Sequence, residues 1–120
     1  MLSYSRYTEL EVWKHARELA SNIYEITTAF PKTEQFGLTS QMRRSVVSIP
    51  SNIAEGCGRQ HKKETIHFLS FARSSLYELE TQLYISKDLD YITEDKLSFC
   101  LSKIENLGKL VNGFIRYQQK

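Results

Sequence analysis

The segment 38–55 carries two different stripes on what its spacing predicts to be one helix. At 100° per residue, one narrow arc of that helix is apolar, and its members are Leu38, Met42, Val46, Ile49 and Ile53. A second arc, about a quarter-turn away, is polar and consists of Gln41, Arg44, Ser45, Ser48, Asn52 and Glu55. Solvated helix faces are normally rich in Lys and Glu, so this arc of short hydrogen-bonding side chains indicates a face that meets another surface.

Three further segments repeat apolar residues at steps of three and four, which predicts helices. The first begins with a capping box of Thr8 and Glu11 and is stopped by Pro31. Its seam consists of Trp13, Ala16, Ala20, Ile23, Thr27 and Phe30. A third helix is predicted over about 62–88, with the seam Leu69, Ala72, Leu76, Leu79 and Leu83. A fourth is capped by Thr93 and has the seam Leu97, Leu101, Ile104, Leu107, Val111 and Phe114.

Pro50 interrupts the second predicted helix, because it has no N–H and its ring crowds the preceding turn. The alternatives are a kink and a new helix that begins at Pro50. The apolar stripe keeps its phase across the proline, which favours the kink. Gly56 and Gly58 then offer a left-handed helix stop. Because the connections are short, we predict an all-α, antiparallel up-down-up-down four-helix bundle, kinked at Pro50, in a single domain over 1–120.

Composition places the chain among ordinary globular proteins, with 41% hydrophobic and 25% charged residues. The longest uncharged run, 45–54, is too short to span a bilayer, so we expect no membrane role. The N-terminal residues lack the apolar core of a secretory signal. Cys57 and Cys100 are far apart, which is typical of reduced thiols. We therefore expect a cytoplasmic protein.

Positive charge is concentrated between residues 43 and 73. Six basic residues stand there against two acidic ones, a net +4, whereas the whole chain has +2. A local basic patch suits an anionic partner, of which nucleic acid is the commonest, although a solvated surface is the alternative. The candidate phosphate ligands are Arg43, Arg59, Lys62, Lys63 and Arg73.

No pattern typical of an enzyme emerges. Glu64 and His67 have the Glu-x-x-His spacing of di-iron bundles, but such sites need two of these motifs. Cys57 lies near Arg59, where mild activation is conceivable, yet no His and carboxylate accompany it, which favours a structural thiol. We expect no catalytic residues, no metal and no cofactor.

The polar arc continues on the third predicted helix through Ser75, Glu78 and Gln82. Arg44 and Glu78 have three alternatives: they pair across the two helices, face a neighbouring subunit, or face water. Because a buried charge is costly without a partner, we expect each charge to be paired in either of the first two cases, and Arg44→Ala should destabilise the fold or the assembly more than Arg43→Ala does. The predicted structural polar network is Gln41, Arg44, Ser48, Asn52, Glu55, Ser75 and Glu78.

Three blocks of the chain resemble a known family, the four-helix-bundle proteins related to the 23S ribosomal RNA intervening-sequence protein, which include accessory proteins of diversity-generating retroelements. The blocks are LEVWKHA (10–16), FPKTEQFGLTSQMRRSVVSIPSNIAEG (30–56) and FLSFARSSLYELETQL (68–83). The middle block is the specific one, and the positions in it that match the family pattern are Pro31, Glu34, Gln41, Arg44, Ser48, Pro50, Asn52, Glu55 and Gly56.

The resemblance implies an antiparallel four-helix bundle that assembles as a ring-shaped homopentamer. Family genes lie inside insertions in bacterial 23S ribosomal RNA genes, and the retroelement branch serves as a non-catalytic partner of a reverse transcriptase. We therefore expect a non-enzymatic homo-oligomer that binds structured RNA, DNA or a nucleic-acid-processing protein through its basic turn. The alternative is a structural protein-interaction module with no nucleic-acid role.

Overall fold

The computed structural model describes the backbone of residues 2–120 and the side chains of residues 6–120. Four long helices account for most of that range and no strand occurs within it, so the predicted all-α class is confirmed. The elements are the 3₁₀ segment η1 (Leu2–Glu9), α1 (Glu11–Thr27), the 3₁₀ turn η2 (Lys32–Glu34), α2 (Leu38–Cys57), α3 (Lys62–Asp88) and α4 (Glu94–Gln118). None of the described helices combines the length and the apolarity that a membrane span needs.

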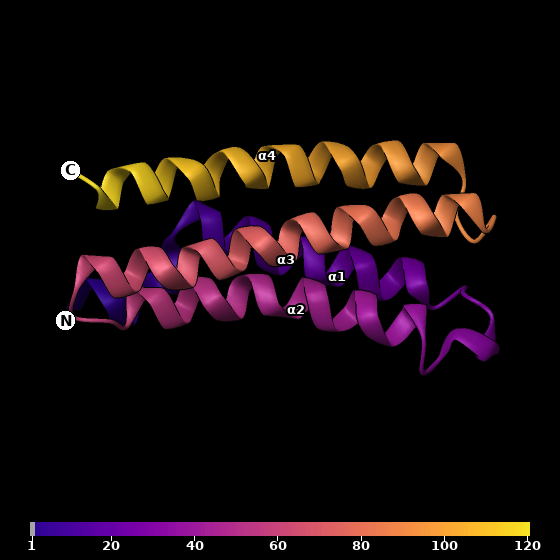
Figure 1. The fold of residues 1–120 in the computed structure, drawn as a ribbon, viewed down its shortest axis with the longest axis horizontal. Helices are drawn as coiled ribbons and strands as arrows, with labels where there is room; N and C mark the ends of the chain where they lie inside the picture. The colour runs from indigo at the N-terminus through magenta and orange to yellow at the C-terminus, as the bar shows by residue number, and fades with distance from the viewer. Residues whose placement is uncertain (1) are drawn as a thin grey trace.

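The four helices form the corners of a square, in which α1 and α3 each pack against both α2 and α4. The side-chain hydrogen bonds that join α2 to α3 are those of Thr65 with Gly56, Ser48 with Ser75, and Ser86 with Met42. Residue numbers fall along α2 as they rise along α3, so these two helices are antiparallel. Figure 1 shows the same alternation around the whole bundle, with the two chain ends at one end of it.

The core follows the apolar stripes read from the sequence. The stripe of α2 is buried at Met42, Val46, Ile49 and Ile53. The seam of α3 is buried at all five predicted positions, and that of α4 is buried at Leu97, Ile104, Leu107 and Val111. Leu101 and Phe114 of α4 are partly covered, while Cys100 and Ile115 complete its buried face.

The seam predicted for α1 is partly wrong. Val12 and Leu19 are buried, whereas Trp13 and Ala20 are only partly covered. Because α1 packs against both α2 and α4, its buried face is wider than a heptad stripe, and residues at the edges of that face stay half exposed. Trp13 rests on Tyr7 of η1 instead, with the two ring centroids 5.4 Å apart.

One predicted helix cap is wrong and another is confirmed. Thr8 belongs to η1, so α1 begins at Glu11 after Leu10, whose side chain offers no capping oxygen. The predicted capping box therefore does not form. Thr93 does cap α4, because its hydroxyl oxygen accepts a hydrogen bond from the backbone N–H of Lys96 at 3.2 Å.

Helix α2 continues through Pro50, so the alternative of a new helix beginning there is wrong, and the bend expected at this residue stays a prediction. The left-handed stop is also wrong: Gly58 has φ −85°, and no glycine among the described residues has a positive φ. Gly56 serves a different purpose. A Cβ at Gly56 would lie 3.2 Å from both the Thr65 carbonyl oxygen and the Phe68 Cβ, so its missing side chain lets α3 approach closely.

Candidate nucleic-acid interface

Three of the predicted phosphate ligands lie together where α2 is joined to α3. Arg59 belongs to the connection, and Lys62 and Lys63 begin α3. The connection is short because α2 runs on to Cys57, so all three cations stand at one end of the bundle. We call Arg59, Lys62 and Lys63 the basic turn.

Arg59 is held in a defined orientation by two neighbours. One of its terminal nitrogens donates to the Glu55 carboxylate at 2.9 Å, and its guanidinium carbon lies 4.5 Å from the centroid of the Phe68 ring. A guanidinium carries five N–H donors, and this ion pair uses one of them. Arg59 can therefore accept an anionic ligand without first giving up Glu55.

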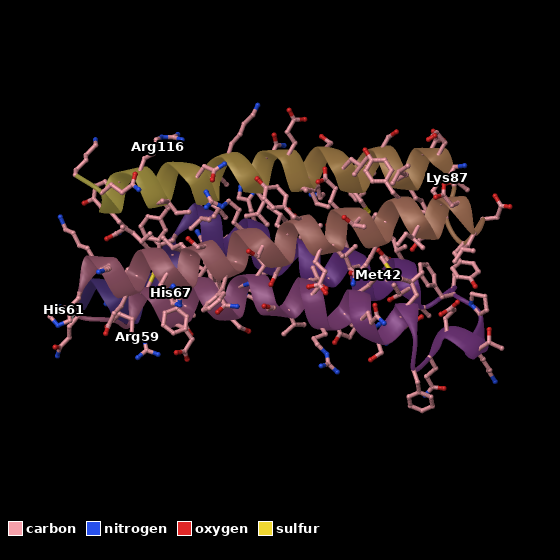
Figure 2. All side chains as sticks on the ribbon, viewed as in Figure 1. Met42, Arg59, His61, His67, Lys87 and Arg116 are labelled. Carbon is pink, nitrogen blue, oxygen red and sulfur yellow. The ribbon has the colours of Figure 1, made fainter. Side chains whose placement is uncertain are left out.

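The basic turn borders an open surface groove. Its lining residues are Arg59, His61, Lys63, Glu64, His67 and Phe68. Figure 2 shows Arg59, His61 and His67 projecting from the same end of the bundle. The ammonium group of Lys62 donates to the Lys120 carbonyl oxygen at 3.2 Å, while Lys63 is exposed. With the histidines neutral, the basic turn together with Glu55 and Glu64 carries a net charge of +1.

Arg43 and Arg73 lie elsewhere and have partners in the chain. Arg43 is in the second turn of α2, about 20 Å of helix away from the basic turn. It donates to the Thr27 hydroxyl at 2.9 Å and to the Tyr24 carbonyl oxygen at 3.2 Å, and it covers the Tyr24 ring. Arg73 donates to the Asn112 side-chain oxygen at 2.9 Å. These two arginines join helices, so they do not extend the basic turn.

The middle of the predicted polar network lies in the contact between α2 and α3. The hydroxyl oxygens of Ser48 and Ser75 are 2.8 Å apart, and the Asn52 side chain donates to the Ser48 hydroxyl at 2.9 Å and to its carbonyl oxygen at 2.8 Å. These short side chains permit close helix packing and satisfy one another there.

The longer members of that network are exposed to solvent, namely Gln41, Arg44, Glu55 and Glu78. Arg44 and Glu78 form no ion pair with each other or with another side chain of residues 6–120. Pairing inside the protomer is therefore not what the structure shows. A neighbouring subunit and water remain as their alternatives.

Glu64, His67 and Cys57 are the residues that the sequence offers as possible catalytic or metal-binding groups. Glu64 and His67 are both exposed on the first turns of α3, and no cluster of three or more metal-ligating side chains forms within the described chain. Cys57 is buried, and burial raises the pKa of its thiol, which opposes activation. Burial also raises the pKa of the Cys100 thiol to about 11.

An aromatic cluster beside the basic turn was missed in the sequence. The rings of His67 and Phe71 have centroids 4.5 Å apart, and Phe68 lies 6.1 Å from Phe71. Phe71 is 46% exposed. We call His67, Phe68 and Phe71 the aromatic ledge. The four-residue spacing of His67 and Phe71 was the available signal, since such residues are neighbours on a helix.

A second missed contact joins the two connections at the opposite end. The Glu34 carboxylate accepts a hydrogen bond from the Leu38 N–H at 3.0 Å and another from the Tyr91 hydroxyl at 2.9 Å. These bonds stabilise the ionised carboxylate and lower the pKa of Glu34. The same carboxylate raises the pKa of Tyr91. Fifty-seven residues separate the two groups, so no local pattern reports the contact.

Comparison with known proteins identifies a family and solved structures with a similar fold. A family model described as "23S rRNA-intervening sequence protein" matches residues 8–113. The crystal structure of a protein of unknown function from the S23 ribosomal protein family of Bacteroides thetaiotaomicron VPI-5482 is similar, with a TM-score of 0.78 and 25% sequence identity. The similarity covers 87% of this chain and 97% of that chain. None of the curated proteins compared with the chain matches it.

Proposed function

The chain belongs to the 23S rRNA-intervening sequence protein family, and from this premise we propose that it is a non-catalytic helical bundle that assembles with copies of itself and binds nucleic acid through the basic turn. The observation that carries the proposal is the grouping of Arg59, Lys62 and Lys63 at one end of the bundle, with Arg59 already oriented by Glu55. Lysine and arginine side chains presented together are the usual ligands of backbone phosphates.

Binding of this kind depends on charge and shape more than on base sequence. The basic turn lies where α2 is joined to α3, whereas base readout in the major groove uses side chains along one exposed face of a helix. The expected ligand is therefore structured RNA or DNA with little sequence preference. The buried, unactivated thiols support a non-catalytic role, and two free cysteines fit a reducing cytoplasm.

Self-assembly is supported by the apolar surface of the single chain. The exposed large apolar side chains include Tyr24, Phe36, Val47, Tyr77, Tyr84, Ile85, Leu89 and Tyr117. Phe36, in the connection between α1 and α2, is 90% exposed. These side chains offer another copy of the chain apolar surface that self-assembly would bury. A homopentamer would repeat the basic turn five times, so weak single contacts would act together.

The nucleic-acid part is tested by changing the basic turn to glutamine in one triple variant, Arg59→Gln with Lys62→Gln and Lys63→Gln. Three phosphate contacts per chain correspond to a slope of log K against log salt of about −2 to −3, and the variant should flatten that slope toward zero. The measurement is fluorescence anisotropy of a labelled structured RNA, titrated at low and at physiological salt.

The matched control removes the same charge from the other end of the bundle. It combines Lys32→Gln, Lys87→Gln and Lys96→Gln, which lie in η2, at the end of α3 and at the start of α4. We expect this control to bind as the wild type does. Absence of binding by the wild type at low salt would refute nucleic-acid binding, and an equal loss in both variants would show that only net charge matters.

The assembly part is tested by light scattering at micromolar concentration. We expect a particle of five times the 14.0 kDa chain mass. A stable monomer would contradict the proposal.

The second candidate function is a protein-interaction module, for which a reverse transcriptase is one partner class. The exposed apolar residues named above favour it. It becomes the better account if the assembled wild type binds no nucleic acid at low salt.

A further inference from the structure

The aromatic ledge of His67, Phe68 and Phe71 has no role in phosphate binding, although it adjoins the basic turn. Phe71 leaves 46% of its surface in water, and His67 is exposed next to it. These two rings are in edge contact, at 4.5 Å between centroids and 66° between planes. The exposed surfaces of these two neighbouring rings therefore offer an aromatic surface on which a flat ligand can stack.

Electrostatic attraction at this end of the bundle is modest. Together with Glu55 and Glu64, the basic turn carries a net charge of only +1, and one donor of Arg59 is committed to Glu55. Charge alone therefore gives each chain a weak and salt-sensitive contact. A second, uncharged contribution beside the cations would raise the affinity of each chain.

The juxtaposition of cations and rings discriminates between paired and unpaired nucleic acid. In a duplex, the bases are stacked on one another and present only their edges and the phosphates. An unpaired nucleotide presents a base face that stacks on an aromatic side chain, while its phosphates lie within reach of neighbouring lysines and arginines. Phe68 connects the two sets, because it contacts Phe71 on one side and carries the Arg59 guanidinium on the other.

We propose that the aromatic ledge stacks on an unpaired base whose flanking phosphates are held by the basic turn, so that the ligand of this site is unpaired nucleic acid, such as single-stranded RNA or an RNA loop. This inference rests on the proposed nucleic-acid binding and names the class of ligand. Glu55 and Glu64 are both exposed beside the basic turn, and their charges would repel a second close phosphate strand, which a duplex would bring.

The experiment compares two labelled probes in anisotropy titrations at about 50 mM salt, where charge contacts are strong. One probe is an oligouridine of about 12 nucleotides, within the range of single-strand sites, and the other is a blunt RNA duplex of the same length. We expect the wild type to bind the oligouridine more tightly. Phe71→Leu keeps an apolar, helix-forming side chain but removes the ring, and it should weaken oligouridine binding by about 5- to 100-fold with duplex binding unchanged.

Phe99→Leu is the matched control. Phe99 is 50% exposed on the first turns of α4 and lies near Lys103, so the same substitution is made at an exposed phenylalanine beside a cation, at the opposite end of the bundle. We expect both probes to bind this variant as they bind the wild type. Circular dichroism checks that both variants are folded.

Three outcomes would overturn the inference. If the wild type binds neither probe, the proposed function fails and the inference fails with it. If the duplex is bound at least as tightly as the oligouridine and Phe71→Leu changes neither affinity, the protein binds nucleic acid but the aromatic ledge does not stack on a base. If Phe71→Leu changes the particle mass in light scattering, the ledge is a subunit contact.

Discussion

Substituting Gly56 with alanine tests how closely α2 and α3 pack, because the added methyl group would lie between the two helices. Alanine is more favourable than glycine inside a helix by about 1 kcal/mol, so Gly56→Ala would stabilise an isolated α2. In the bundle, however, the new Cβ would lie 3.2 Å from the Thr65 carbonyl oxygen and from the Phe68 Cβ. Neither atom can rotate away, so α3 must shift by a few tenths of an ångström.

The cost of that shift outweighs the gain in helix propensity. Overpacking of a tight contact costs about 1–3 kcal/mol. The shift also stretches the buried hydrogen bond from the Thr65 hydroxyl to the Gly56 carbonyl oxygen, now 2.9 Å, which adds up to about 1 kcal/mol. We expect Gly56→Ala to be destabilised by about 1–2 kcal/mol, a fall of roughly 4–8 °C in Tm for a chain of this size.

Gly108→Ala is the matched control within α4. Its Cβ would lie 3.6 Å from a terminal carbon of Leu76, an ordinary contact with a flexible side chain. Only the propensity gain then operates, so this variant should be stabilised by about 0.5–1 kcal/mol. Thermal unfolding of both variants at one protein concentration, followed by circular dichroism, gives the comparison. A Gly56→Ala protein as stable as Gly108→Ala would refute the close α2–α3 contact.

Two further predictions concern the ionisable groups. Arg43→Ala loses the hydrogen bonds from Arg43 to α1, so it should lower the free energy of unfolding by about 1 kcal/mol. Arg44→Ala changes an exposed side chain and should stay within about 0.5 kcal/mol of the wild type. This order is the reverse of the one expected from the sequence, and urea unfolding of both variants measures it. Because the pKa of Glu34 is lowered in the folded protein, its ionised carboxylate contributes stability above pH 4.5, the ordinary pKa of a glutamate carboxyl. That stability is lost as the pH falls through the pKa of Glu34 in the folded protein. Glu34→Gln should therefore have a lower Tm than the wild type at pH 7, and the difference in Tm should be smaller near pH 3. Tyr91→Phe removes one of the two hydrogen bonds to Glu34, so its Tm at pH 7 should lie between those of the wild type and Glu34→Gln. A difference in Tm between the wild type and Glu34→Gln that stays the same from pH 7 to pH 3 would contradict this role of Glu34.

The elements and the core could be predicted from the sequence because their cause is local. Apolar residues repeat with the helix period in each segment, and burying them requires one stripe to meet another. The extents of α2 and α3 and the buried seams of both helices followed from that repeat. Thr93 was found for the same reason, since a cap is a relation between residues three apart.

The site could be predicted only in part. Arg59, Lys62 and Lys63 lie at one end of the bundle because only four residues join α2 to α3, so their closeness in the sequence predicts their closeness in the fold. The same reasoning failed for Arg43 and Arg73, whose partners Tyr24 and Asn112 come from other helices. Net charge counts every arginine equally, whereas the position of each guanidinium depends on which helix its side chain contacts.

The sequence by itself determined four amphipathic helices, their order and the position of the basic turn. Only the tertiary structure decided that Gly56 is a contact rather than a helix stop, that Arg43 binds α1 while the next residue, Arg44, faces solvent, and that Glu34 meets Tyr91. The physical reason is the same in each case. Periodicity reports which side of a helix is apolar, but a distance between helices depends on how all four pack, and that distance decides whether a polar group is paired or hydrated.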